Sequence, residues 1–312
     1  SYAEWGDVWL SEGFATFSEQ LFADRFHGPA AARTVRAQTI SRVTNDPCGM
    51  LYVNDTSRSD SLFDGRRVYA KGAGVVTMLR DLAPHDSLFF TGLRTYQQLY
   101  GNGHARTSDI KAIMEHYYSM NLDTFFNQWI YGRGYPVYTT TWNQKGSKVI
   151  VKLVQAQSCP AHTGHFTTPI EVQLRTASGD TTIRLYNTAD TQLFTFTWFP
   201  AVTSVVLNPN SITVCKQNGN VRKDTSLVAL TGNMLKRSEL KVFPNPSKNH
   251  WQIDQLPEET ALVLTDNNGR TVWQGTSSKG STTIPGERLP TGNYFLKMTD
   301  NSGSESIQLV RW

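Results

Sequence analysis

The hydrophobic pattern of the chain changes near residue 136, and this change limits the fold more than any other feature. Before it, apolar residues recur every three or four positions, as on the buried face of a helix. After it, apolar and polar residues alternate, as in strands with one buried face. Helices followed by strands are typical of α+β proteins and of chains with separate domains. The sequence therefore predicts a multi-domain α+β protein in which a helical part precedes two small β-sandwich modules.

The two periods, and the turn residues between them, also predict where the elements lie. Helices are expected over 5–26, 30–43, 66–82, 87–100, 108–119 and 123–131, with a long loop over 45–64. Strands are expected over 148–154, 170–174, 181–185, 193–197 and 203–207. Seven shorter strands are expected over 241–243, 251–253, 261–264, 271–273, 282–284, 294–298 and 306–310. The predicted domains are 1–136, 137–216 and 239–312, with a polar linker over 217–238.

Composition argues against several classes of protein. The net charge is only +4 over 312 residues and Lys and Arg form no block, so nucleic acid is not an expected partner. No apolar run approaches the roughly 18 residues of a membrane-spanning helix, so no transmembrane segment is expected. Three cysteines are too few for a disulfide scaffold. The chain begins at Ser1 without Met or a leader, so its N-terminus is expected to be cut.

The first predicted helix carries two glutamates on the same face. Glu12 and Glu19 are seven residues apart, and Thr16 lies between them. The neighbours Leu10 and Phe14 are apolar, and a carboxylate in such surroundings is costly unless it is paired, hydrogen-bonded or bound to a metal. The alternative is a helix with two solvated glutamates. The spacing alone does not decide between these readings.

Residues 5–15, W-G-D-V-W-L-S-E-G-F-A, closely resemble the W-x-D-x-W-L-N-E-G-F-A segment of the aminopeptidase N-like zinc metallopeptidases, the gluzincins. In that family an H-E-x-x-H helix supplies two zinc ligands, and the glutamate of this segment is the third. The resemblance implies that Glu12 is a ligand of one Zn²⁺ and that Glu19 supports the site. Ser11 replaces the usual Asn, which leaves the ligand in place. Residues 1–136 would then be the helical C-terminal half of a thermolysin-like catalytic domain.

The same resemblance shows what this chain lacks. In the family, eighteen residues separate the second His from the glutamate, whereas only eleven precede Glu12 here. None of the seven histidines lies in an H-E-x-x-H motif, and the family's G-A-M-E-N strand is also missing. The expectation is a fragment of a longer protein whose H-E-x-x-H lies before Ser1, so that this chain alone is inactive. The alternative is a family member that has lost its chemistry.

A second match lies at residues 68–73, V-Y-A-K-G-A, which resemble the family's V-Y-x-K-G-A. The family's tyrosine donates a hydrogen bond to the oxyanion of the tetrahedral intermediate, so Tyr69 is the implied catalytic residue. A phenol suits this role because it stays protonated at neutral pH. The run Gly72-Ala73-Gly74 favours close helix packing, since the G-x-x-x-x-G-K-[ST] phosphate loop is absent. A weaker match lies at residues 125–130 and 134–136, which resemble the family's F-x-x-W…G-x-P.

Residues 137–216 would be the small β-domain that follows the catalytic domain in this family. Cys159 and Cys215 lie near its first and last strands, and a disulfide between them is possible in a secreted protein. The set Cys159, His162 and His165 is an alternative metal site, but its spacing fits no common zinc module. A loop with two exposed histidines is favoured over a metal there.

The last module carries its own resemblance. The stretches V-F-P-N-P-S at 242–247, D-N-N-G-R at 266–270 and L-P-T-G-N-Y-F at 289–295 resemble the C-terminal sorting domain of type IX secretion cargo in Bacteroidota. The alternative is an Ig-like carbohydrate-binding or adhesive module. The resemblance implies that residues 239–312 are an address read by the type IX secretion machinery, with no part in catalysis.

Together, the two resemblances imply a secreted or surface-exposed zinc aminopeptidase that acts on peptides and crosses the outer membrane by type IX secretion. The alternative is a non-catalytic, surface-exposed protein that keeps the fold as a peptide-binding or adhesive module. An intact H-E-x-x-H in the longer sequence would favour the enzyme, and its loss would favour the alternative.

Overall fold

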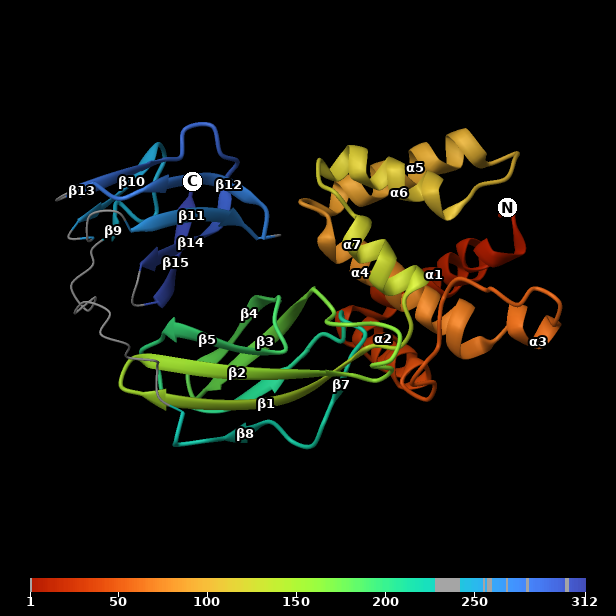
Figure 1. Cartoon of the computed structure of the whole chain (residues 1–312), viewed down its shortest axis with the longest axis horizontal. Coiled ribbons are helices and arrows are strands. Elements are labelled where there is room, and N and C mark those ends of the chain that lie inside the picture. Colours follow the sequence, from red (N-terminus) through yellow and green to blue (C-terminus); the bar gives the residue numbers. More distant parts are fainter. Residues whose placement is uncertain are drawn as a thin grey trace. The chain divides into compact units, whose positions relative to one another are not determined.

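The computed structural model describes residues 2–227, 242–254, 256, 260–267, 269–278, 281–300 and 303–312. The chain divides into two compact units, Ser1–Leu227 and Val228–Trp312, each of which is described by itself (Figure 1). The first unit contains helices followed by two sheets, and the second contains two further sheets. The chain thus combines helices with several β-sheets, as the change of period predicts.

The helices of the first unit lie close to their predicted ranges. They are η1 (Trp5–Asp7), α1 (Trp9–His27), α2 (Pro29–Val43), α3 (Ser59–Leu62), η2 (Gly65–Lys71), α4 (Gly72–Leu82), α5 (Asp86–Tyr100), α6 (Thr107–Tyr118), α7 (Asp123–Phe126) and η3 (Asn127–Tyr131). Gly28, at φ 84°, ends α1, and Pro29 begins α2. The structure differs from the prediction in its irregular turns: η1 is a 3₁₀-helix, η2 and η3 are π-helices, and α3 interrupts the predicted loop.

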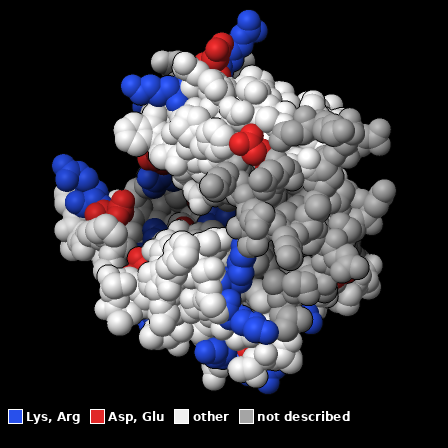
Figure 2. Space-filling model, turned by 90° about the vertical axis from the view of Figure 1, so that its left-hand side faces the viewer, with Lys and Arg blue, Asp and Glu red and all other residues white. Residues whose placement is uncertain are grey.

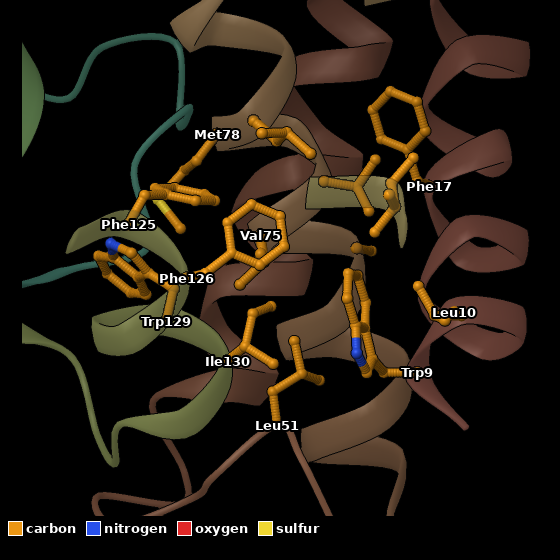
Figure 3. Packing of buried hydrophobic residues seen from close by; sticks show 14 of the residues in the cluster. Trp9, Leu10, Phe17, Leu51, Val75, Met78, Phe125, Phe126, Trp129 and Ile130 are labelled. Atoms are coloured by element: carbon orange, nitrogen blue, oxygen red, sulfur yellow. The ribbon is translucent and has the colours of Figure 1, made fainter. Parts of the chain in front are cut away.

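A single hydrophobic core holds these helices together. Helix α4 is buried along most of its length, and Figure 3 shows its Val75 between side chains from both sides. Trp9, Leu10 and Phe17 of α1 lie on one side, and the aromatic residues of α7 and η3 lie on the other. Each fully buried side chain of this size contributes about 1.5–3 kcal/mol of hydrophobic stabilisation. The core therefore fixes α1 against the η2–α4 segment.

The strands of the first unit form two sheets. One has the order β5-β2-β1-β7, with β8 also paired to β1, and the other has the order β4-β3-β6. The strands are β1 (Pro136–Lys145), β2 (Lys148–Gln157), β3 (Thr168–Thr176), β4 (Gly179–Asn187), β5 (Thr191–Thr197), β6 (Val202–Leu207), β7 (Lys216–Gln217) and β8 (Arg222–Lys223). Side chains from both sheets, among them Tyr138, Val151, Val172 and Val205, form one core. The five predicted strands are confirmed.

The first residues of the predicted linker lie against β1. Strands β7 and β8 pair with β1 in parallel, and the amides of Asn218 and Asp224 donate to the carbonyls of Tyr138 and Trp142. Residues 217–227 are therefore part of the first unit. The remainder of the predicted linker, 228–238, lies outside the described residues.

The disulfide of the structure joins the helical part of the first unit to its sheets. Cys48 bonds to Cys159, 111 residues further along the chain. The expected pairing of Cys159 with Cys215 is therefore wrong, and Cys215 is a free, buried thiol whose pKa burial raises to about 12. Neighbouring hydrogen bonds join the same loops, including Ser158 Oγ to the carbonyl of Pro47 at 2.6 Å.

The second unit consists of short strands around a core of its own. One sheet has the order β13-β10-β9 and the other the order β12-β11-β14-β15. The strands are β9 (Val242–Phe243), β10 (His250–Asp254), β11 (Ala261–Asp266), β12 (Thr271–Thr276), β13 (Ser281–Pro285), β14 (Gly292–Asp300) and β15 (Gly303–Arg311). Trp251 and Ile253 of one sheet pack with Leu264 and Leu296 of the other. All seven predicted strands are confirmed, except that Lys241 lies outside the described residues.

The P-N-P-S stretch after β9 covers the free edge of the last strand. The side chain of Asn245 donates to the carbonyl of Gln308 and accepts from the amide of Val310. Ser247 pairs through its backbone with the same strand, since its amide donates to Val310 and its carbonyl accepts from Trp312. An uncovered edge strand is prone to pair with other chains. Residues that carry the sorting resemblance thus also close the edge of a sheet.

Charged side chains are sparse on the face shown in Figure 2. Its described surface consists mostly of uncharged residues, with Lys, Arg, Asp and Glu scattered among them. In the part of the chain that the structure describes, no helix combines the length and the apolar character needed to span a membrane.

Candidate functional site

Glu12 lies in the first turn of α1 and is half-buried. The hydroxyl of Thr16 donates to the backbone carbonyl of Glu12 at 2.8 Å and leaves its carboxylate available. Among the described residues, no Lys, Arg or His forms an ion pair with Glu12. A half-buried carboxylate without a cationic partner has the chemistry of a cation ligand.

The other polar residues of the same motif fix the start of α1 against α6. The hydroxyl and the amide of Thr107 donate to Asp7 Oδ1 at 2.6 and 3.3 Å. The indole nitrogen of Trp9 donates to the Thr107 hydroxyl at 3.0 Å. Burial raises the pKa of Asp7, although its hydrogen bonds to Thr107 oppose the shift. Asp7 and Trp9 therefore hold the helix that presents Glu12.

Tyr69 lies in the π-helix η2 and is half-buried, close enough to Glu12 for the two groups to interact electrostatically. Burial, the negative charge of Glu12 and a hydrogen bond to its carboxylate all raise the pKa of the Tyr69 hydroxyl. The phenol is therefore held in its neutral, proton-donating form at pH 7. π-helical turns are rare and frequently occur at functional sites. The structure thus brings together the two site residues that the sequence places in separate motifs.

Two glycines lie where α1 crosses the η2–α4 segment. A Cβ built on Gly72 would lie 2.7 Å from the Cα of Gly13, and a Cβ on Gly13 would lie 2.9 Å from the Cα of Gly72. Gly74 is also close-packed, because its Cβ would lie 2.5 Å from Val214. Close helix packing is therefore confirmed at Gly72, whereas Gly74 packs against a side chain outside the helices.

Lys71 follows Tyr69 by two residues and is 1% exposed. Its Nζ donates to the carbonyl of Gly49 at 2.8 Å, in the loop that carries Cys48. Burial lowers the pKa of Lys71 to about 7, with Asp46 opposing the shift. The sequence did not point to this residue, because the side chain of a lysine in a helix is ordinarily expected to be exposed to solvent.

Glu19 lies two turns beyond Glu12 on α1 and is exposed. No described interaction connects it to Glu12 or Tyr69. Within the described ranges, no three His, Cys, Asp or Glu side chains come close enough together to hold a metal ion. Cys159 is in the disulfide and His165 pairs with Asp190 at 2.9 Å, which argues against the alternative site at 159–165.

Two family profiles match this chain. Residues 1–129 match the profile described as "Peptidase family M1 domain", and residues 241–311 match "Secretion system C-terminal sorting domain". Residues 1–129 are thus similar to peptidase family M1, and residues 241–311 to secretion sorting domains. This agrees with the two resemblances in the sequence, to the aminopeptidase N family and to type IX secretion cargo.

Curated relatives of the M1 region are aminopeptidases and a related factor. Aminopeptidase N of Lactobacillus delbrueckii subsp. lactis is 31% identical over 140 residues, which cover 43% of this chain and 16% of the relative. Tricorn protease-interacting factor F2 of Thermoplasma acidophilum is 27% identical over 194 residues, which cover 60% of this chain and 24% of the relative. The chain thus spans about a sixth to a quarter of the length of these relatives.

A solved structure shows the same fold. The crystal structure of Legionella pneumophila aminopeptidase A in complex with aspartic acid matches 70% of this chain and 25% of that chain, with a TM-score of 0.57 and 14% identity. At this identity the match supports the fold alone. The sorting domain separately marks the protein for export to the cell surface or the surroundings.

Proposed function

We propose that this protein is a secreted, zinc-dependent aminopeptidase that removes N-terminal residues from peptides. Residues 1–136 would be the helical C-terminal half of a thermolysin-like catalytic domain, and residues 137–216 the β-sandwich that follows it. Because residues 217–227 belong to the first unit, the connection to the sorting domain, 239–312, would be residues 228–238. The observation that carries the proposal is the proximity of Tyr69 to Glu12, whose charge raises the pKa of the Tyr69 hydroxyl, in a segment that matches peptidase family M1. The two residues come from motifs more than fifty positions apart.

In this proposal Glu12 is one ligand of a single Zn²⁺ and Glu19 supports the site. The half-buried carboxylate of Glu12, which forms no ion pair among the described residues, fits a ligand, but the described residues form no group of three His, Cys, Asp or Glu side chains that could hold the metal. The remaining ligands, an H-E-x-x-H pair of histidines, and the general base would come from a longer form of the protein. A bound zinc ion would polarise the scissile carbonyl and activate water.

Tyr69 would stabilise the negative charge that develops on the scissile carbonyl oxygen. Its raised pKa keeps the hydroxyl protonated, and its position beside Glu12 places the donor next to the proposed metal ligand. The negative charge of Glu12 beside the hydroxyl also raises the pKa of Tyr69 and so favours the protonated form.

Replacing Tyr69 tests this role in the protein as its host cell makes it. We expect Tyr69→Phe to lower kcat on aminoacyl-p-nitroanilides by about 10²–10³-fold, as loss of one oxyanion donor does, while zinc content stays unchanged. The matched control is Tyr2→Phe, which removes a neighbouring hydroxyl and should leave kcat nearly unchanged. A Tyr69→Phe enzyme with the kcat of the wild type would rule out the assignment.

The sorting domain would deliver the enzyme through the type IX secretion machinery. Because the second unit has a core of its own, deleting 239–312 should leave peptidase activity in the cell lysate but stop export across the outer membrane. The measurement is the peptidase activity of the cell lysate and of the culture medium, for the shortened and the full protein. A shortened protein that still reaches the medium would refute the sorting role. One that folds normally but loses activity would make these residues part of the enzyme.

A further inference from the structure

We propose that Gly13 and Gly72 are positioning residues whose contact sets the distance between Glu12 and Tyr69. This inference rests on the proposed function, because it explains how the two proposed functional groups are held in register. Neither glycine would touch substrate or metal. Gly13 would act by positioning Glu12, and Gly72 would act by positioning Tyr69.

The contact between the two glycines is one of backbone against backbone. A Cβ on Gly72 would meet the Cα of Gly13 at 2.7 Å. A Cβ on Gly13 would meet the Cα and the carbonyl carbon of Gly72 at 2.9 and 3.0 Å. Real Cβ atoms almost never approach this closely, and a backbone atom cannot rotate away as a side chain can. Any larger residue at either position therefore has to separate the two helices.

The functional groups lie next to this crossing on both sides. Glu12 directly precedes Gly13 on α1, and Tyr69 lies three residues, about one helical turn, before Gly72. Separation of the helices at the glycines would therefore carry the carboxylate and the hydroxyl apart. The electrostatic effect of Glu12 on the Tyr69 hydroxyl weakens as the two groups separate.

A second contact between the same helices would survive such a change. The hydroxyl of Thr77 on α4 donates to Gln20 Oε1 on α1 at 2.7 Å, and both residues are buried. This pair lies further along both helices than the glycines. A substitution at the crossing is thus expected to open one end of the helix pair and leave the other end closed.

The 312-residue chain itself can test the inference by fluorine NMR. With 3-fluorotyrosine in place of its 12 tyrosines, the Tyr69 resonance is identified as the one that Tyr69→Phe removes. At a fixed pH of 7, Glu12→Gln should shift this resonance in the otherwise wild-type chain. In a Gly72→Ala chain, Glu12→Gln should shift the resonance by about half as much or less. The reason is that two side chains influence each other less when they are further apart. An undiminished shift in the Gly72→Ala chain would overturn the proposal.

Two matched glycine variants separate positioning from general overpacking. Gly74→Ala also inserts a methyl group into the packing of α4, but against the side chain of Val214 rather than α1. Gly65→Ala lies at the start of η2, where a Cβ meets no atom within 4 Å. Both chains should keep the full shift. If Gly74→Ala reduced the shift as much as Gly72→Ala does, the effect would be one of general destabilisation and the proposal would fail.

Gly13→Ala is the second variant at the crossing, with a slightly smaller overlap than Gly72→Ala. Folding of each chain is followed by its thermal unfolding transition. If both variants failed to fold, the contact would serve the fold itself, and the positioning role would be contradicted.

Kinetic measurements distinguish a failure of this inference from a failure of the proposed function. In the active protein, Gly72→Ala should lower kcat with little change in KM, and it should have almost no further effect in a Tyr69→Phe background. A reduced NMR shift together with unchanged kcat would support the positioning contact and contradict the catalytic role of Tyr69. Equal losses of kcat in both backgrounds would show that Gly72 does not act through Tyr69.

Discussion

Removal of the Cys48–Cys159 disulfide should lower the free energy of unfolding of the first unit by about 4–5 kcal/mol. The bond closes a loop of 111 residues, and loop-closure entropy in the unfolded chain accounts for a loss of this size. The native loops have other contacts, since the Tyr135 hydroxyl donates to the carbonyl of Thr44 and the Gly134 amide to that of Gly49. The folded state should therefore change little. Urea titration of the Cys48→Ala/Cys159→Ala chain against the wild type measures the difference.

A reducing agent provides the control for this experiment. It should lower the stability of the wild-type chain to that of the double variant and leave the double variant unchanged. The free thiol of Cys215 is common to both chains and cancels in the comparison. A loss below about 1 kcal/mol would contradict the role given to this disulfide.

Burial of Lys71 should make the stability of the first unit rise with pH above neutrality. The pKa of Lys71 is about 7 in the folded chain and near 10.5 in the unfolded chain, so between these values only the unfolded chain binds the proton. Stability rises with pH wherever the unfolded state binds more protons. Relative to Lys71→Met, the wild type should therefore gain on the order of 3–5 kcal/mol from pH 7 to pH 10.

The difference between the two chains isolates Lys71 from other titrating groups. Urea titrations of both chains at several pH values give this difference directly. Lys145→Met removes an exposed lysine, and its difference from the wild type should stay flat over the same range. A flat difference for Lys71→Met would show that the lysine remains charged inside the fold.

Local patterns were enough to predict most helices and strands. Period-two alternation located β2 to β6 and β10 to β15, because each of these strands buries one face. The π-helical turns η2 and η3 were not predicted, since their apolar spacing is close to that of an α-helix. Strands β7 and β8 were missed because each has two residues and is formed by pairing with β1.

The sequence predicted the two motifs of the site but not how their residues are arranged in space. The sequence singled out Glu12 and Tyr69, but their proximity depends on the contact of Gly13 with Gly72, which joins segments far apart in the chain. The partners of Cys48 and Lys71 are likewise set by long-range contacts. Three cysteines allow three pairings, and the expected one assumed a bond within the β module.

The most direct test of the proposed active site is the zinc content of the protein as its host cell makes it. Elemental analysis should find about one zinc per chain, as in single-metal peptidases. Glu12→Gln should lose most of this metal and the peptidase activity, whereas Glu19→Gln, two turns further on α1, should keep most of the zinc. The 312-residue chain alone should bind zinc weakly, because its described residues form no group of three His, Cys, Asp or Glu side chains that could hold a metal ion. A Glu12→Gln protein that retains its zinc as firmly as the wild type would contradict the account.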